Sequence, residues 1–297
     1  MVFLLHGKKI LKEFSNEIKC FIEELRHNNC TILSTTSFYN HLQKLSSEYN
    51  NKTITTISNI EVVNKKIDYL ICFGGDGTIL NAAIIVKHRE IPIVGINTGR
   101  LGFLAAISKN ELSSLIHKLI TKDYTLSKRT LLNIDTQKTQ LNFPFALNEI
   151  SVSSKQNTSM INIKVYLNEE YLNTYWADGL IISTPTGSTG YSLSCGGPIV
   201  MPESNNFIIT PIAPHNLNVR PLVVSDNNNI RIEVVDNNNE DFLLSMDSRN
   251  QYLKNNVSIT IKKANYSIKL IELPSTTYSK TLREKLLWGL DKRNYES

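Results

Sequence analysis

The sequence predicts a combination of α/β and all-β architecture: an N-terminal Rossmann-like α/β domain, a C-terminal domain like a β-sandwich, and a C-terminal helix. In the first third of the chain, strand-like and helix-like segments alternate, which is typical of a mainly parallel sheet. From about Tyr124, short β-rich runs between polar turns replace the helical periodicity. We therefore expect an α/β domain over residues 1–123, an all-β domain over 124–274 and a helix within 275–297.

The elements of the first domain follow from their apolar spacing. Residues 2–5 read as a strand, and apolar side chains then recur at helical spacing over residues 11–25, before a short strand at 31–33. Two apolar runs, Ile67–Phe73 and Ile91–Ile96, read as buried parallel strands that each end in a glycine-containing turn. Ser108 is placed to cap a helix whose apolar face runs from Leu112 to Ile120.

The second domain shows the period of two residues that is typical of half-buried strands. Residues 161–167, 230–235 and 257–261 alternate in this way or carry β-branched side chains. Near the end of the chain, Tyr278, Leu282 and Leu286 recur at i, i+4 spacing, which predicts an amphipathic helix. The sequence leaves open whether this helix packs back on the first domain.

Bulk properties narrow the classes of function. The 297 residues suffice for two hydrophobic cores, and a formal net charge of +5 with scattered Lys and Arg favours neither nucleic acid nor membrane as a partner. The four cysteines form no CxxC pair and the six histidines no HExxH motif, so we expect no protein-bound metal site. No signal peptide or apolar run of about 18 residues is visible, and we expect a cytoplasmic protein.

The first motif that carries chemistry is GGDGT at residues 74–78, between a buried strand and an apolar helix. Glycines let backbone N–H groups approach an anion closely, so we expect Gly74, Gly75, Gly77 and Thr78 to bind phosphate groups. Asp76 does not fit a purely phosphate-binding role, because its carboxylate repels phosphates. It must bind a metal ion, accept a proton or bind a hydroxyl, and the alternative is that it caps the following helix.

A second constellation lies in the β-rich half. Residues 177–198 contain a strand followed by many hydroxyls and glycines, which suits ribose and adenine better than bare phosphate. Upstream, Asn148 and Glu149 end another apolar run. An amide can pair with a donor and an acceptor of an adenine edge, and a carboxylate can accept hydrogen bonds from two ribose hydroxyls. The alternative is a loop rich in serine and threonine beside an incidental turn.

Together these motifs resemble the NAD kinase family, whose members transfer the γ-phosphate of ATP to the 2′-hydroxyl of the adenosine ribose of NAD. The resemblance covers most of the chain and is more specific than GGDG, which lipid kinases and phosphofructokinases share. Gly190 replaces an alanine common in the family, and Trp176 and Arg249 stand where arginine and glutamine are common. The matching segments are GGDGT at 74–78, GINTGRLGFL at 95–104, NE at 148–149, DGLIISTPTGSTGYSLSCGGPIV at 178–200, PH at 214–215, RPLVV at 220–224 and DSR at 247–249.

The resemblance assigns roles position by position. It implies that Asp76 is the general base, with Gly77 beside it at the dinucleotide, that Asn148 and Glu149 contact the adenosine part of NAD, and that Asp178 lies toward the nicotinamide end. It also implies a dinucleotide-binding loop formed by Thr189, Gly190, Tyr191, Ser192, Leu193 and Ser194.

The expected function is therefore that of an NAD kinase with NAD and ATP as partners. A divalent cation such as Mg²⁺ is expected as cofactor, held mainly by the phosphates and water, because the chain has no P-loop motif. The resemblance implies a homo-oligomer, either dimer or tetramer. Two alternatives stay open: a lipid kinase that shares the GGDG turn, and a non-catalytic dinucleotide sensor in which Asp76 binds ribose without taking its proton.

Overall fold

The computed structural model describes residues 1–7, 14–45, 49, 53–63, 66–99, 101–136, 139–155, 160–235, 241–255 and 257–287. The chain forms two compact units, Met1–Lys128 with Ile268–Ser297 and Arg129–Ser267. These bounds differ from the expected 123/124 and 274/275, because β6 (Thr125–Arg129) and β19 (Ile268–Glu272) extend the sheet of the first unit. Within the described ranges, no helix is both long and apolar enough to span a membrane.

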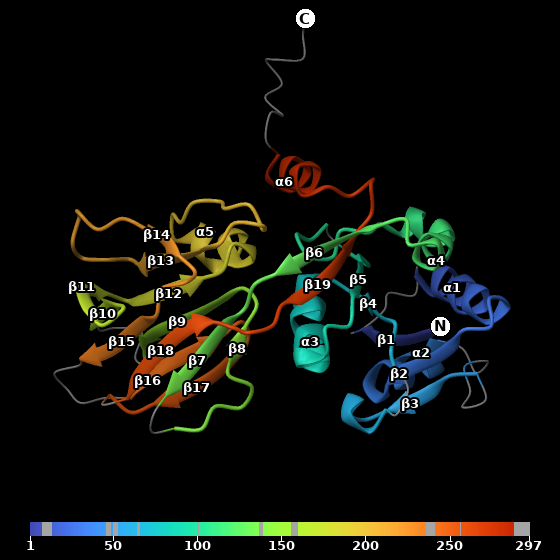
Figure 1. Cartoon of the computed structure of the whole chain (residues 1–297), viewed down its shortest axis with the longest axis horizontal. Helices are drawn as coiled ribbons and strands as arrows, with labels where there is room; N and C mark the ends of the chain where they lie inside the picture. Colours follow the sequence, from blue (N-terminus) through green and yellow to red (C-terminus); the bar gives the residue numbers. More distant parts are fainter. Residues whose placement is uncertain are drawn as a thin grey trace, which may run out of the picture. The chain divides into compact units, whose positions relative to one another are not determined.

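The first unit is built on one seven-stranded sheet in the order β3-β2-β1-β4-β5-β19-β6 (Figure 1). Its central strands pair in parallel, as expected for an α/β domain. The carboxyl ends of β1 and β4 lie side by side, because Gly7 pairs with Phe73. The strands are β1 (Val2–Gly7), β2 (Thr31–Thr35), β3 (Thr55–Ile57), β4 (Tyr69–Phe73) and β5 (Ile93–Ile96), followed by β6 and β19.

Helices with one apolar face cover this sheet. In α1, buried side chains recur three and four residues apart, which places them on one face of the helix. The helix α3 is apolar over most of its length and buries Ile79, Ala82, Ala83 and Val86. The helices are α1 (Ser15–His27), α2 (Thr36–Leu45), η2 (Ile60–Val62), α3 (Asp76–Val86), η3 (Lys87–Arg89), η4 (Lys109–Glu111) and α4 (Leu112–Thr121).

The second unit contains two six-stranded sheets, β11-β10-β15-β18-β7-β8 and β14-β13-β12-β9-β16-β17. Burial alternates along β10 and β15, so each strand turns one face to a shared core and the other to solvent. The expected sandwich-like domain is confirmed. Its strands are β7 (Leu132–Thr136), β8 (Phe145–Ala146), β9 (Glu149–Ser154), β10 (Ile161–Leu167), β11 (Glu170–Ala177), β12 (Gly179–Ser183), β13 (Asn206–Ile212), β14 (Leu222–Ser225), β15 (Ile230–Val235), β16 (Phe242–Met246), β17 (Arg249–Leu253) and β18 (Ser258–Lys263).

The expected C-terminal helix is α6 (Tyr278–Leu286), which begins after Thr277, whose hydroxyl accepts the N–H of Lys280. It belongs to the first unit, which resolves the question that the sequence left open. The Tyr278 ring lies 6.4 Å from the ring of Phe103. Residues 288–297 of the expected terminal segment lie outside the described residues.

Candidate functional site

The glycine turn at Gly74–Gly75 connects the end of β4 to the start of α3. Gly74 has a φ of +157°, and an added Cβ there would lie 2.2 Å from the Thr78 hydroxyl oxygen, so this position requires glycine. An added Cβ at Gly75 or Gly77 would meet no atom within 4 Å. The backbone of the turn is therefore open to the approach of a ligand at the N-terminus of an 11-residue helix, a location that favours anions.

The carboxylate of Asp76 is anchored by three consecutive backbone amides. Its Oδ2 accepts the N–H of Phe103 at 2.9 Å, and its Oδ1 accepts those of Leu104 at 2.9 Å and Ala105 at 3.1 Å. The N-cap of α3 is Gly75 and no side chain caps the helix, so the interpretation of Asp76 as a helix cap is wrong. The side chain of Asp76 keeps 30% of its surface exposed and can still meet a ligand.

The loop after β5 is shaped to present these amides. Asn97 accepts the N–H of Gly99 at 2.7 Å and donates to the carbonyl of Ala105 at 3.3 Å. An added Cβ at Gly102 would lie 2.0 Å from Oδ1 of Asp76, so a larger residue would displace the carboxylate. The GINTGRLGFL segment thus positions Asp76, although Arg100 of this motif lies outside the described residues.

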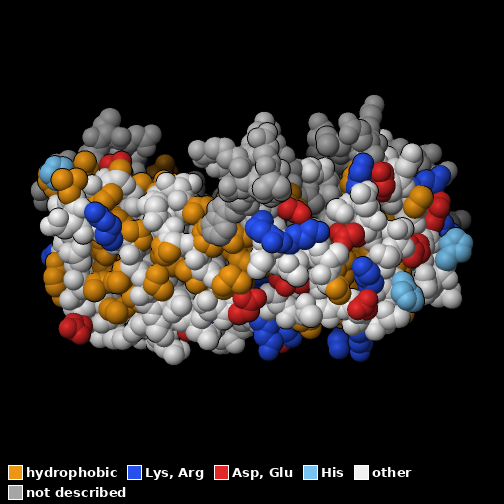
Figure 2. Space-filling view, turned by 90° about the horizontal axis from the view of Figure 1, so that it is seen from above, with side chains coloured by type: hydrophobic (Ala, Val, Ile, Leu, Met, Phe, Trp, Pro, Cys, Tyr) orange, Lys and Arg blue, Asp and Glu red, His pale blue; other side chains and the backbone are white. Residues whose placement is uncertain are grey.

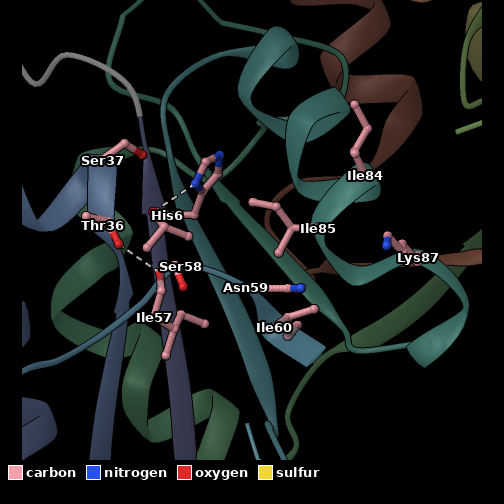
Figure 3. Close-up of a pocket in the computed structure, with 11 residues that line it drawn as sticks. His6, Thr36, Ser37, Ile57, Ser58, Asn59, Ile60, Ile84, Ile85 and Lys87 are labelled. Atoms are coloured by element: carbon pink, nitrogen blue, oxygen red, sulfur yellow. Dashed lines mark hydrogen bonds between the residues drawn. The ribbon is translucent and has the colours of Figure 1, made fainter. Parts of the chain in front are cut away.

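A pocket of about 570 Å³ opens at the carboxyl ends of β1, β2 and β3, on the same edge of the sheet as the glycine turn (Figure 3). Figure 3 shows α3 with Ile84 and Ile85 on one side and His6, Thr36 and Ile57 on the other. In parallel sheets, ligands bind outside the carboxyl ends of the strands. No pattern in the sequence indicated this pocket, because its lining residues come from separate elements.

In the second unit, Asp247 organises the Asn148–Glu149 segment. Its Oδ2 accepts the N–H of Leu147 at 3.0 Å, and its Oδ1 accepts those of Asn148 at 2.8 Å and Glu149 at 3.3 Å. Only 6% of the Asp247 side chain is exposed, and Nη2 of Arg249 lies 3.7 Å from Oδ2. Burial raises the pKa of Asp247, while the backbone N–H groups and Arg249 act against this rise.

Two buried polar atoms next to Asp247 have no hydrogen-bond partner among the described residues: Oδ1 of Asn148 and Oε2 of Glu149. Burial and, to a smaller extent, repulsion by Asp247 raise the pKa of Glu149 to about 7, and the N–H of Tyr191 acts in the opposite direction. A buried acceptor without a donor is costly in free energy. Both atoms are therefore available as hydrogen-bond acceptors.

The hydroxyl-rich segment lies directly beside this pair, although it is far away in sequence. The Thr184 hydroxyl donates to the carbonyl of Leu147 at 2.6 Å, and the Thr184 N–H donates to the carbonyl of Asn148 at 2.9 Å. An added Cβ at Gly187 would lie 2.1 Å from the Asn148 carbonyl oxygen, and one at Gly190 would lie 2.8 Å from Oε2 of Glu149. The two segments that the sequence analysis singled out are thus packed against each other.

The segment from Thr189 to Ser194 is largely helical and not the expected loop. The 3₁₀ helix η5 (Thr186–Thr189) leads into the short helix α5 (Tyr191–Ser194), because successive N–H groups find carbonyl acceptors three and four residues back. The Ser192 hydroxyl is buried and bonds the Thr210 hydroxyl at 2.8 Å, so it faces the interior.

The other residues of this segment are more accessible. Tyr191 is 46% exposed, Ser194 is exposed, and Thr189 and Leu193 are half-buried. Asp178 is exposed between β11 and β12. Burial is the main cause of the raised pKa of Tyr191, and the charge of Asp178 contributes to it. The structure thus brings Asn148, Glu149, Gly190 and Tyr191 together.

The two groups of residues belong to different units. Asp76 and the glycine turn lie in the first unit, and the Asn148–Glu149 pair with Asp178 and residues 189–194 lies in the second. Across the described ranges, no three His, Cys, Asp or Glu side chains are grouped to hold a metal ion. Sequence reasoning missed Phe103–Ala105 as donors to Asp76, and it gave Asp247 no role although DSR was among the matching segments.

Two family models match the chain. The ATP-NAD kinase N-terminal domain matches residues 2–124, and the ATP-NAD kinase C-terminal domain matches residues 147–273. The chain is 50% identical over 284 residues to an NAD kinase of Flavobacterium psychrophilum, with 94% of this chain and 91% of the relative covered. It is 45% identical over 297 residues to an NAD kinase of Flavobacterium johnsoniae, with 99% and 100% covered.

Solved structures show the same fold. A yeast NADH kinase crystallised with NADH has a TM-score of 0.86 at 23% identity, covering 97% of this chain and 88% of that chain. An NAD kinase from Archaeoglobus fulgidus in complex with ATP has a TM-score of 0.72 at 25% identity, covering 96% and 97%. Both family models belong to NAD kinases, and neither supports the lipid kinase interpretation.

Proposed function

This chain belongs to the ATP-NAD kinase family, and from that premise we propose that Asp76 is the general base of its reaction. The enzyme transfers the γ-phosphate of ATP to the 2′-hydroxyl of the adenosine ribose of NAD, giving NADP. The proton of the hydroxyl passes to the Asp76 carboxylate while the bond between O2′ and the γ-phosphorus forms. The bond from that phosphorus to the leaving oxygen breaks, and ADP leaves.

The position of Asp76 supports this role. Three backbone N–H groups fix the carboxylate beside the open glycine turn, and its side chain remains 30% exposed. An ionised carboxylate has about four acceptor positions, so one remains on Oδ2 for an incoming hydroxyl. A positioned general base typically contributes about 10²–10⁴-fold to the rate.

Different features of the structure support the binding of ATP, the phosphate donor, and of NAD, the phosphate acceptor. Gly74, Gly75, Gly77 and Thr78 would place the phosphates of ATP at the N-terminus of α3, and the pocket at the ends of β1–β3 has room for its nucleoside. Mg²⁺ would enter as part of the Mg–ATP substrate, since no group of carboxylates among the described side chains forms a metal site.

The second unit would bind NAD. The orphaned acceptors of Asn148 and Glu149 suit the adenosine part, and Asp178, Thr189, Gly190, Tyr191, Ser192, Leu193 and Ser194 complete the proposed set, with Ser192 acting through its backbone. Gly77 would lie beside Asp76 at the dinucleotide.

The proposal also includes a homo-oligomeric state and a cytoplasmic location. Figure 2 shows hydrophobic side chains gathered on one face of the second unit. The exposed large apolar residues of this unit include Trp176, Met201, Leu217, Leu222 and Val223. Exposed apolar surface of this kind supports contact with a second copy.

Asp76→Asn tests the proposed base. The amide keeps the shape of the side chain but cannot accept a proton, so turnover should fall by about 10²–10⁴-fold. Purified wild-type and variant enzyme are assayed for NADP formation with NAD, ATP and Mg²⁺, and NAD affinity is measured by calorimetry. Near wild-type turnover would falsify the base role. A wild-type chain that binds NAD but forms no NADP would instead be a dinucleotide sensor.

A further inference from the structure

The C-terminal helix brings a lysine to the proposed catalytic carboxylate. Nζ of Lys285, on the last turn of α6, lies 3.8 Å from Oδ2 of Asp76. The same ammonium group lies 4.9 Å from the centre of the Phe103 ring, and Phe103 donates its N–H to Oδ2. Both side chains keep about a third of their surface exposed, so the pair faces solvent and is open to a ligand.

The position of Lys285 is fixed by α6. Tyr278, at the start of this helix, places its ring 6.4 Å from the ring of Phe103. The Ser275 hydroxyl, just before the helix, bonds the carboxylate of Glu111. The helix is therefore attached near its start, and its last turn carries Lys285 over the loop that anchors Asp76.

Lys285 is not needed to anchor Asp76. Three backbone N–H groups already bind the carboxylate, and 3.8 Å from Nζ to Oδ2 exceeds a hydrogen-bond distance. Among the described residues, no acceptor is hydrogen-bonded to Nζ. The ammonium is thus positioned by its ring contact and its helix, with its donors available.

The reaction geometry places the transferred group next to this cation. A hydroxyl that gives its proton to Asp76 must lie about 2.6–3.2 Å from the carboxylate, and its oxygen must lie about 3–3.5 Å from the phosphorus that it attacks. The phosphorus then lies at most about 7 Å from the carboxylate oxygen. An ammonium 3.8 Å from that oxygen, with both side chains about one third exposed to solvent, can contact a phosphoryl group bound on this exposed side.

We propose that Lys285 is a further catalytic residue, which donates hydrogen bonds to the transferring phosphoryl group. The inference rests on the proposed role of Asp76. Charge spreads over the phosphoryl oxygens in the transition state, and preorganised donors stabilise this charge. When Asp76 takes the proton from the 2′-hydroxyl, its own charge is neutralised. The ammonium then interacts mainly with the phosphoryl oxygens.

A purely structural role is the competing explanation. Lys285 and Arg283 both lie in the last turn of α6, where cations interact favourably with the helix dipole, and Nζ of Lys285 lies over the Phe103 ring. Arg283 is exposed and supplies the matched control, because its loss removes the same charge from the same turn.

Lys285→Met keeps an unbranched side chain of similar length and removes the charge. Loss of one preorganised donor typically costs on the order of 10²-fold in kcat. We expect this decrease in kcat, with a smaller change in the KM for NAD, and partial recovery in Lys285→Arg. Arg283→Met should retain wild-type kinetics. All rates are expressed per folded molecule, with the folded fraction taken from thermal melts followed by circular dichroism.

The wild type and Arg283→Met separate this inference from the proposed function. If neither forms NADP, the proposed function fails. If both are active and Lys285→Met stays within threefold of them per folded molecule, the lysine only stabilises the helix and the inference is overturned. A loss of kcat in Lys285→Met that exceeds its loss of folded protein supports the inference.

Discussion

Asp76 in the first unit and Asp247 in the second are held by the same device. Each carboxylate accepts hydrogen bonds from three consecutive backbone N–H groups: Phe103 to Ala105 for Asp76, and Leu147 to Glu149 for Asp247. Each also has a cation within 4 Å, Lys285 for the first and Arg249 for the second. The two sites differ in exposure, with 30% of the Asp76 side chain exposed against 6% of the Asp247 side chain.

This difference separates a group that can react from a group that shapes a site. Arg249, next to Asp247, also donates to the carbonyls of Phe143 and Phe145, so this cation is committed to the protein. Lys285 has no such hydrogen bond among the described residues. The buried carboxylate fixes the backbone of Asn148 and Glu149, whereas the exposed one keeps an acceptor position on Oδ2 open to solvent.

Matched Asp→Asn substitutions give the largest contrast in stability. In Asp247→Asn an NH₂ group replaces one carboxylate oxygen, so buried backbone N–H groups that donate to this oxygen lose their acceptor. We therefore expect the free energy of unfolding to fall by about 2–3 kcal/mol. Asn tolerates the φ of +52° at this position, so backbone strain adds little. Asp76→Asn should cost about 1 kcal/mol or less, because water reaches the exposed carboxylate.

Urea denaturation of the two variants and the wild type measures this contrast. Equal losses for both substitutions would show that exposure does not distinguish the two carboxylates.

The pH dependence of stability sharpens the comparison within the buried site. Glu149 has a pKa of about 7 when folded, above the value of about 4.3 in an unfolded chain. The folded state therefore binds a proton that the unfolded state has lost between these values. The stability that this group contributes is fully present below pH 4.3 and is lost as the pH rises through 7.

Glu149→Gln removes this loss. The free energy of unfolding of the variant relative to wild type should increase from pH 5 to pH 8 by at most about 3 kcal/mol. Asp247 is present in both proteins, so its contribution largely cancels. Urea midpoints at both pH values test the effect, and a difference that does not change with pH would contradict the raised pKa.

Gly190→Ala should have the smallest effect. An added Cβ at this position would lie 2.8 Å from Oε2 of Glu149. A carboxylate at the end of a flexible side chain can move by a few tenths of an ångström. We expect the KM for NAD to rise a few-fold, or about 1 kcal/mol in binding, with kcat unchanged. A rise above about 50-fold would mean that Glu149 cannot shift.

Much of the fold was predictable because burial leaves a periodic pattern in the sequence. The apolar run before Gly74 identified β4, and Ser108, which was expected to cap a helix, is the N-cap of η4, directly before α4. The glycine-flanked Asp76 and the Asn148–Glu149 pair were recognised from their residue types. The helical form of residues 189–194 was not, because its hydroxyls and glycines are equally typical of loops.

The sequence by itself determined most of the elements, the family and the candidate reactive residues, since these depend on local spacing and residue type. Only the tertiary structure decided which amides hold Asp76, which carboxylate holds the Asn148–Glu149 segment, and that a lysine of the last helix faces Asp76. The physical reason is that these partners come from elements far apart in the chain. Packing of the sheets and helices sets the distances between such elements, and no local periodicity records those distances.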